Sequence, residues 1–177
     1  MLGLISLVVW SLQGIMAIAV LGLSIDLVKG QLLGDAPTTT KYGTFTGGFG
    51  LAVAILGLAA TFIDAIPALI VMAADALSGL LLLGGGIAFA IGLRGVTCTK
   101  DKAVAMLDNE LINGGSVTED GKRKFDKVTE DLLMDNCKKA TADQALQFVT
   151  VGFVITTIFL VFLVWKNGRG SKGGAYV

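Results

Sequence analysis

Asp75 is the side chain in this sequence that fits its surroundings least. It lies about seven residues into a long apolar stretch, which places it roughly 10–12 Å along a helix. A carboxylate at that depth in a membrane is costly and is by default a candidate functional group. No Lys or Arg lies within the apolar stretches to pair with it. We therefore expect Asp75 to be protonated or hydrogen-bonded, either to Gln13 at similar depth in the first stretch or to a Ser or Thr hydroxyl.

Two roles are open to Asp75. As a structural group, it would hold neighbouring helices together through hydrogen bonds inside the membrane. As a functional group, it would bind a proton or an ion. A single acid without a second carboxylate, a basic partner or a broken helix supports transport only weakly, so we favour the structural role. Asp26 and Asp64 lie at the ends of apolar stretches, where water or lipid headgroups can solvate them.

The two cysteines lie at the two feet of one polar segment. Cys98 follows the third apolar stretch and Cys137 shortly precedes the fourth. A disulfide between them would close the segment, would require an oxidising compartment and would contribute about 3–4 kcal/mol by loop entropy. The alternative is a pair of unrelated reduced thiols on a cytosolic loop. We favour the disulfide, and two cysteines are too few ligands for a structural metal site.

The sequence lacks the residues of common catalytic and metal sites. It contains no histidine, which removes imidazole bases, His-ligated zinc and His-ligated haem. The glycine run at 84–86 lies inside an apolar stretch and is not followed by Lys-Ser or Lys-Thr, so it is not a phosphate-binding loop. We therefore predict that the protein is not an enzyme and has neither a cofactor nor a metal site.

The elements that position these residues are four apolar stretches long enough to cross a membrane. The 177 residues are 54% hydrophobic and 16% charged, and the mean hydropathy is +0.76. Soluble domains are about 25% charged, whereas a membrane span needs roughly 20 mostly apolar residues. The fold class is therefore an all-α membrane protein, a four-transmembrane-helix bundle. The predicted spans cover about 4–28, 44–63, 68–93 and 145–165.

Most of the charged residues lie in a hydrophilic insert between the third and fourth spans, at 95–143. Val104, Leu107 and Leu111 recur there at helical spacing, and Asn-Gly-Gly at 113–115 stops the pattern. A second set, which Thr118 can cap, comprises Phe125, Val128 and Leu132. We therefore expect the insert to be a helical hairpin on the outer side of the membrane.

The fourth span carries a local signal at each end. Thr141 and Gln144 have the spacing of a capping box that would open the helix. Trp165 beside Lys166 is typical of an interfacial anchor at the other end.

Small residues form a regular stripe along the second span. They follow one another at alternating steps of four and three, at Gly43, Gly47, Gly50, Ala54 and Gly57. Small residues on one face let helices approach closely, because backbone packing replaces the hydrophobic effect inside lipid. The third span adds further small residues, including Gly79 and Gly86. These seams pack either within the bundle or against another protomer or a lipid, and we prefer the bundle for the second span.

Four spans are an even number, so both termini lie on the same side of the membrane. The C-terminal segment carries Lys and Arg without acidic side chains, which favours a cytoplasmic location. The expected disulfide also favours an outside insert and inside termini. Counting all basic residues favours the opposite orientation, because the other side holds Lys29, Lys41, Arg94 and eight Lys or Arg in the insert.

Three segments carry a resemblance to a known family. They are VMAADALSG at 71–79, IGLRGVTC at 91–98 and NCKKATADQALQF at 136–148. The chain resembles MARVEL-domain tetraspan proteins and, within them, the fungal non-classical export protein family. The likeness implies a MARVEL-like domain over 1–166 and a short cytoplasmic tail over 167–177. It also implies a plasma-membrane protein with cytoplasmic termini and an outside Cys98–Cys137 pair.

The same resemblance implies a scaffold of lateral membrane domains of the eisosome type, linked to sphingolipids. The partners we expect are membrane lipids, including sphingolipids or sterol, and further protein chains in a homo-oligomer or a larger membrane complex. The net charge is +0 and there is no basic face, so nucleic acid is not expected. The alternative function is an accessory subunit of a membrane complex or a small proton or cation channel that uses Asp75.

Overall fold

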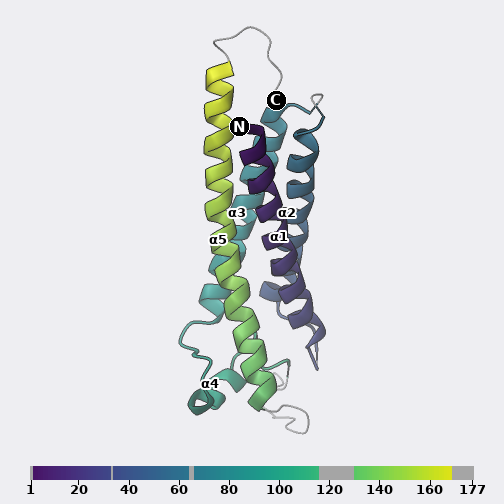
Figure 1. Cartoon of the computed structure of the whole chain (residues 1–177). Coiled ribbons are helices and arrows are strands. Elements are labelled where there is room, and N and C mark those ends of the chain that lie inside the picture. The colour runs from purple at the N-terminus through teal and green to yellow at the C-terminus, as the bar shows by residue number, and fades with distance from the viewer. Residues whose placement is uncertain (1, 33, 64–65, 116–129, 169–177) are drawn as a thin grey trace.

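The computed structural model describes residues 2–32, 34–63, 66–115 and 130–168 of the chain (Figure 1). Four long helices dominate the described residues, and each is apolar and long enough to cross a membrane. The insert adds a 3-10 turn, η1, and a short helix, α4. In chain order the elements are α1 Leu2–Lys29, α2 Thr38–Ala60, α3 Ala68–Gly92, η1 Lys100–Lys102, α4 Ala103–Leu107 and α5 Glu130–Gly168.

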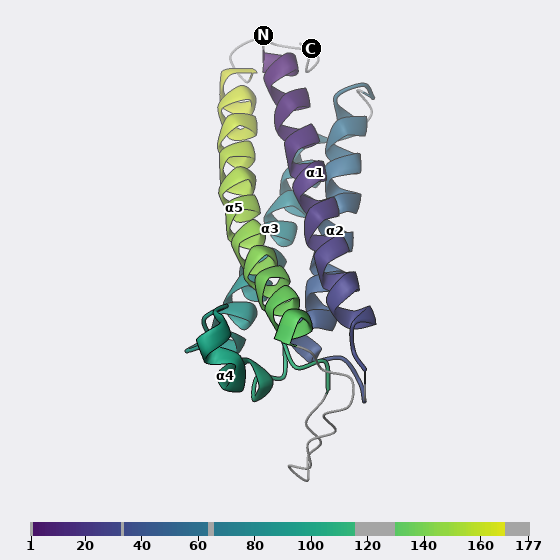
Figure 2. The same cartoon turned by 60° about the horizontal axis from the view of Figure 1, so that its bottom comes forward.

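The four long helices form a closed ring in which each packs on two neighbours. Helix α1 contacts α2 and α5, and α3 contacts α2 and α5, so the order around the ring is α1, α2, α3, α5. Helix α1 begins and α5 ends at the same end of the bundle, while the insert covers the other end (Figures 1 and 2). We call the latter the insert end.

The bundle buries many of its polar side chains and exposes many of its large apolar side chains. Ile15 on α1 and Leu80 on α3 are 63% and 68% exposed, whereas Gln13 and Asp75 on the same two helices are each 1% exposed. This is the reverse of a soluble bundle. It suits a hydrocarbon surround, in which the outer surface must be apolar and polar groups must find partners within the protein.

Helix α5 begins well before the predicted fourth span. It starts at Glu130 rather than near residue 145, so the last part of the predicted insert is a helical extension of the span. The predicted capping box at Thr141 and Gln144 is therefore wrong. Thr141 lies inside the helix, and its hydroxyl donates to the carbonyl of Cys137 one turn earlier. A threonine hydroxyl can serve either as a cap or as such a donor, and the local sequence does not distinguish the two.

The first half of the insert folds into a cap on the bundle. Its regular structure is shorter than predicted, since α4 ends at Leu107 and turns follow to Gly115. The buried side chains of the cap pack against the ends of α1, α3 and α5. The second predicted helix lies largely outside the described residues, and its last apolar residue, Leu132, belongs to α5. The cap contributes Met106, Leu107, Leu111 and Ile112 to a cluster with Leu27, Phe89, Leu93 and Leu133.

A glycine turn joins the cap to the segment after α1. The backbone N–H of Leu32 donates to the carbonyl of Gly114 at 2.7 Å. Gly114 has a φ of +59°, and a Cβ there would lie 3.1 Å from the carbonyl oxygen of Gly30. Both the left-handed backbone and the close approach require glycine, as the predicted turn at 113–115 implies.

Candidate functional site

A polar contact crosses the interior between α1 and α3. The side-chain amide of Gln13 donates to Oδ1 of Asp75 at 2.6 Å, and both side chains are almost fully buried. These helices are opposite each other in the ring, so the contact lies at the centre of the bundle. The structure thus brings together the two intramembrane polar residues that the sequence singled out.

This Asp75 centre contains oxygens that have no hydrogen-bond partner in the structure. They are Oδ2 of Asp75, Oε1 of Gln13 and Oγ of Ser78, which lies one turn after Asp75 on α3. Buried polar atoms are nearly always paired, because an unpaired one costs about 1–3 kcal/mol. The Asp75 centre is therefore incomplete as it stands.

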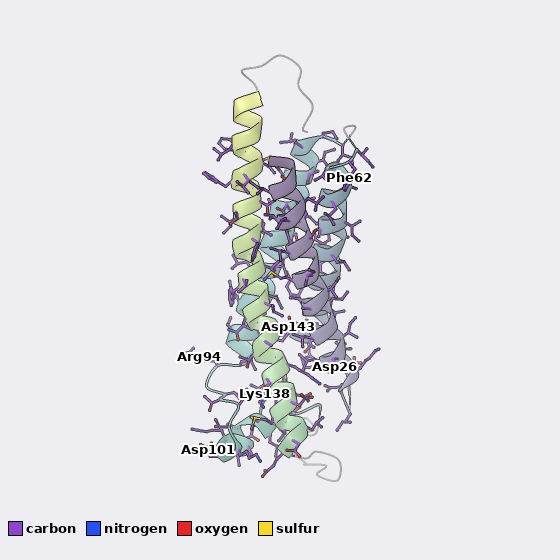
Figure 3. All side chains as sticks on the ribbon, in the orientation of Figure 1. Asp26, Phe62, Arg94, Asp101, Lys138 and Asp143 are labelled. Carbon is purple, nitrogen blue, oxygen red and sulfur yellow. A yellow bond between two sulfur atoms is a disulfide. The ribbon has the colours of Figure 1, made fainter. Side chains whose placement is uncertain are left out.

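A second buried acid, Asp143, lies toward the insert end (Figure 3). Both of its carboxylate oxygens are bonded. The hydroxyl of Ser24 on α1 donates to Oδ2, and the side-chain amide of Gln147 donates to Oδ1 at 3.2 Å. Asp143 thus ties α5 to α1 with both of its carboxylate oxygens bonded, while Oε1 of Gln147 has no hydrogen-bond partner.

The sequence reasoning missed Asp143 because it placed this residue in the insert, before the span. A signal was present. The buried positions of α5 recur at alternating steps of three and four, and Asp143 and Gln147 fall on that stripe. The stripe comprises Leu133, Asn136, Ala140, Asp143, Gln147, Thr150, Val154 and Thr157.

The small residues of α2 form the seam against α1 and the centre of the bundle. A Cβ on Gly47 would lie 2.7 Å from the backbone nitrogen of Leu21 and 2.8 Å from its Cα. At Gly57 it would overlap the indole ring of Trp10. All five residues of this seam are buried: Gly43, Gly47, Gly50, Ala54 and Gly57. This stripe therefore packs within the bundle, as preferred from the sequence, and is not open to lipid or to another protomer.

Three glycines of α3, Gly79, Gly85 and Gly86, face α5. A Cβ on Gly79 would lie 2.7 Å from Cγ1 of Val154, and one on Gly86 would lie 3.2 Å from the ring of Phe148. At Gly85 it would overlap the amide oxygen of Gln147. Glycine thus makes room both for close packing and for the polar side chain that supports Asp143.

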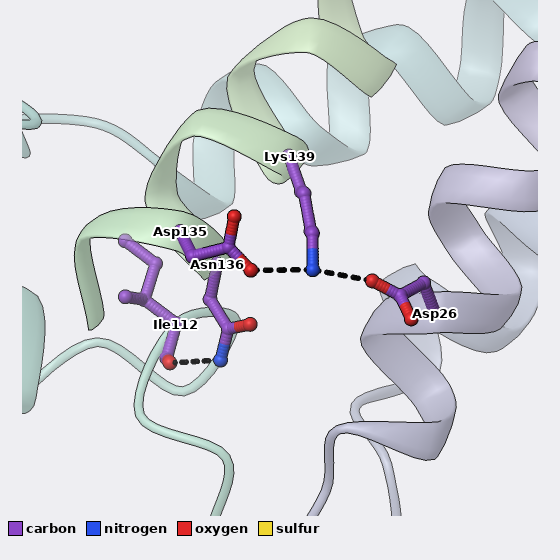
Figure 4. Close-up of polar contacts among 5 residues, drawn as sticks. All are labelled: Asp26, Ile112, Asp135, Asn136 and Lys139. Atoms are coloured by element: carbon purple, nitrogen blue, oxygen red, sulfur yellow. Dashed lines mark hydrogen bonds and ion pairs between the residues drawn. The ribbon is translucent and has the colours of Figure 1, made fainter. Parts of the chain in front are cut away.

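A disulfide and a hydrogen bond hold the cap to α5, and ion pairs beside them join α5 to α1. A disulfide joins Cys98, after α3, to Cys137 on α5, with Cα atoms 5.7 Å apart. Nearby, the Lys139 ammonium forms ion pairs with Asp26 at the end of α1 and with Asp135 one turn earlier on α5 (Figure 4). The side-chain amide of Asn136 donates to the carbonyl of Ile112 in the cap.

With this geometry in place, the family can be assigned. A family model described as a membrane-associating domain, MARVEL, matches residues 3–160. The chain belongs to the MARVEL family. Comparison with curated proteins and with solved structures found no match. The match covers all four long helices up to the last part of α5, so the Asp75 centre, the Asp143 network and both glycine seams lie within the MARVEL domain.

The charged side chains of this MARVEL domain gather at the insert end. Asp26, Arg94, Asp101 and Lys138 all lie there, whereas apolar Phe62 marks the opposite end (Figure 3). Among the described residues, no group of three or more Cys, Asp or Glu side chains is arranged to hold a metal ion. The side chains of the predicted anchors Trp165 and Lys166 lie outside the described part of the structure.

Replacing Asp143 with alanine should destabilise the MARVEL domain by about 2 kcal/mol, because the Ser24 hydroxyl and the Gln147 amide lose their acceptor. The measurement is unfolding of the purified protein by increasing SDS in mixed micelles, followed by circular dichroism. Asp131→Ala, an exposed acid on the same helix, is the matched control and should change stability by less than about 0.5 kcal/mol. Equal effects of the two substitutions would contradict the network.

Proposed function

We propose that this MARVEL protein is a non-enzymatic organiser of lateral domains in the plasma membrane. The observation that supports this most is that the small-residue seams of α2 and α3 are already packed within the bundle. The glycine faces of α2 and α3 pack on other helices of the same bundle. The described chain also places its buried acids in the interior, where each is hydrogen-bonded to a side chain of α1. What remains for interaction is the outer surface.

That outer surface is suited to lipid and to other apolar helices. Large apolar side chains project from α3 along its length, including Leu69, Leu80 and Ile91, which are between 68% and 75% exposed. Helix α1 presents a similar row. A bundle that packs its small-residue seams inside and is apolar outside can enter a lipid domain or a larger assembly without rearranging. We therefore propose membrane lipids, and further protein chains in a homo-oligomer or complex, as its partners.

The orientation we propose has the insert outside and the termini in the cytoplasm. Its support is the Cys98–Cys137 pair, since disulfides persist in oxidising compartments and are rare in the cytosol. In this arrangement residues 1–166 form the membrane domain and 167–177 a short cytoplasmic tail. The resemblance of three segments to the fungal export family supports an eisosome-type domain linked to sphingolipids or sterol.

The alternative, a proton or cation channel that uses Asp75, has less support. Its support is the discovery of a second buried acid, Asp143, on α5. However, fully buried Leu82 and Phe89 lie on α3 between the level of Asp75 and the insert end. Apolar side chains that fill the interior favour a packed bundle over a continuous polar route.

The scaffold proposal predicts a patchy distribution in cells. The tagged protein should concentrate in surface patches, and these should disperse when sphingolipid synthesis is blocked, because lipid composition would hold them together. Fluorescence imaging before and after the block measures this, with a freely diffusing plasma-membrane protein as the control for general damage. A uniform distribution that does not respond to the block would contradict the proposal.

A further inference from the structure

The Asp75 centre has more acceptors than donors. Gln13 supplies one hydrogen bond, from its side-chain amide to Oδ1 of Asp75. Oδ2 of Asp75, Oε1 of Gln13 and Oγ of Ser78 are left without partners, and each belongs to a side chain that is at most 1% exposed. An ionised carboxylate so deep in a membrane protein requires a positive partner, and a buried amide carbonyl requires a hydrogen-bond donor or a cation.

Ser78 differs from the other hydroxyls of the helices. Thr46, Thr150 and Thr157 each donate to a backbone carbonyl of their own helix, which is the usual solution inside a membrane. The Ser78 hydroxyl makes no such bond. It faces Gly50 on α2, where a Cβ would lie 3.5 Å from Oγ. The glycine leaves space beside the hydroxyl.

Among the described side chains, no Lys or Arg forms an ion pair with Asp75. Among the labelled side chains of α1 and α5, the charged ones, Asp26, Lys138 and Asp143, lie toward the insert end (Figure 3). Asp143 shows what a completed buried acid looks like here, since both of its oxygens accept hydrogen bonds. The Asp75 centre lacks that completion.

We propose that the Asp75 centre binds one monovalent cation, a sodium ion or a proton. A carboxylate, an amide carbonyl and a hydroxyl are hard oxygen ligands, which suit such ions and not soft metals. One carboxylate balances one positive charge, whereas a divalent ion would leave an uncompensated charge in the bundle. The occupant pins α1 to α3 across the ring. This binding goes beyond the proposed scaffold function and requires no transport.

Thermal unfolding of the purified full-length protein in detergent tests the site. At about pH 8, the melting temperature in sodium chloride should exceed that in equimolar choline chloride by about 4 °C when sodium is about ten times its Kd. Asp75→Asn should abolish the difference. Asp143→Asn, at the satisfied acid, is the matched control and should keep it. Ser78→Ala should keep the fold and raise the sodium concentration that gives half of the stabilisation about tenfold.

A second series, in choline chloride at falling pH, separates the two occupants. If protons fill the site, the wild type should gain stability as the pH falls and Asp75→Asn should not, because protonation neutralises the carboxylate. The proposal is overturned if Asp75→Asn and wild type respond alike to sodium and to pH. It is also overturned if calcium stabilises the wild type more than sodium does. If Asp75→Asn does not fold, two other results decide. A sodium response of Ser78→Ala equal to that of the wild type overturns the sodium site. A melting temperature of the wild type that does not change with pH overturns the proton site.

Discussion

Gly47→Ala should destabilise the bundle by about 3 kcal/mol, a large effect for the addition of one methyl group. A Cβ at this position would lie 2.7 Å and 2.8 Å from the backbone nitrogen and Cα of Leu21. Main-chain atoms of a helix cannot rotate away as a side chain can. Helix α1 would therefore have to move away from α2 and would lose packing along the seam, which is the main attraction between helices in lipid.

The neighbouring glycine provides the control. At Gly48 the nearest atom to an added Cβ is Cδ1 of Leu21 at 3.9 Å, an ordinary contact. Gly48→Ala should be neutral or slightly stabilising, since alanine favours the helix by about 1 kcal/mol over glycine. Comparing the two variants cancels this helix preference. Unfolding in mixed SDS micelles, followed by circular dichroism, measures both, and a difference below about 1 kcal/mol would contradict the packing of α1 on α2.

Opening the Cys98–Cys137 disulfide should cost about 4 kcal/mol. The bond closes a loop with a sequence separation of 39, and the loop-entropy relation gives that magnitude at 25 °C. It also holds the feet of α3 and α5 together beneath the cap. The double variant Cys98→Ala with Cys137→Ala should therefore unfold at lower denaturant and lose the order of the cap first.

Two readouts check this result. The unfolding free energy of the wild type, with and without reductant, gives the energetic cost, and the double variant should match the reduced wild type. Limited trypsin digestion at Lys100 and Lys102 reports on the cap, and cleavage should accelerate when the bond is open. The double variant in reductant is the control, because it has no disulfide to lose. Equal stability and equal cleavage with and without reductant would show that the cap does not depend on the bond.

Several features of this MARVEL protein could be predicted from local sequence. The four spans follow from the length and hydropathy of each stretch, because a span must bury about 20 residues in hydrocarbon whatever its neighbours are. A hydrogen-bonded partner for Asp75, either Gln13 or a Ser or Thr hydroxyl, follows from the cost of an unpaired polar group at that depth. The stripe at Gly43, Gly47 and Gly50 follows from helical spacing alone.

The boundary of the fourth span could not be read in the same way. Polar residues before residue 145 indicated a loop, and Thr141 offered a cap, yet α5 is continuous from Glu130. Its charged first turns are stabilised by contacts made elsewhere in the chain, through the disulfide, the Lys139 ion pairs and the cap cluster. For the same reason Asp143 was read as an insert residue, although it is a buried acid.

The sequence by itself determined that this chain spans a membrane, which faces of its helices carry small residues, and that Asp75 lies within a span. These depend on properties of single segments. Only the tertiary structure decided that α2 turns its glycines toward α1, that Asp143 meets Ser24, and that Ser78 has no partner. Such contacts join residues far apart in the chain. They depend on the order of helices in the ring and on their relative heights, which no local pattern specifies.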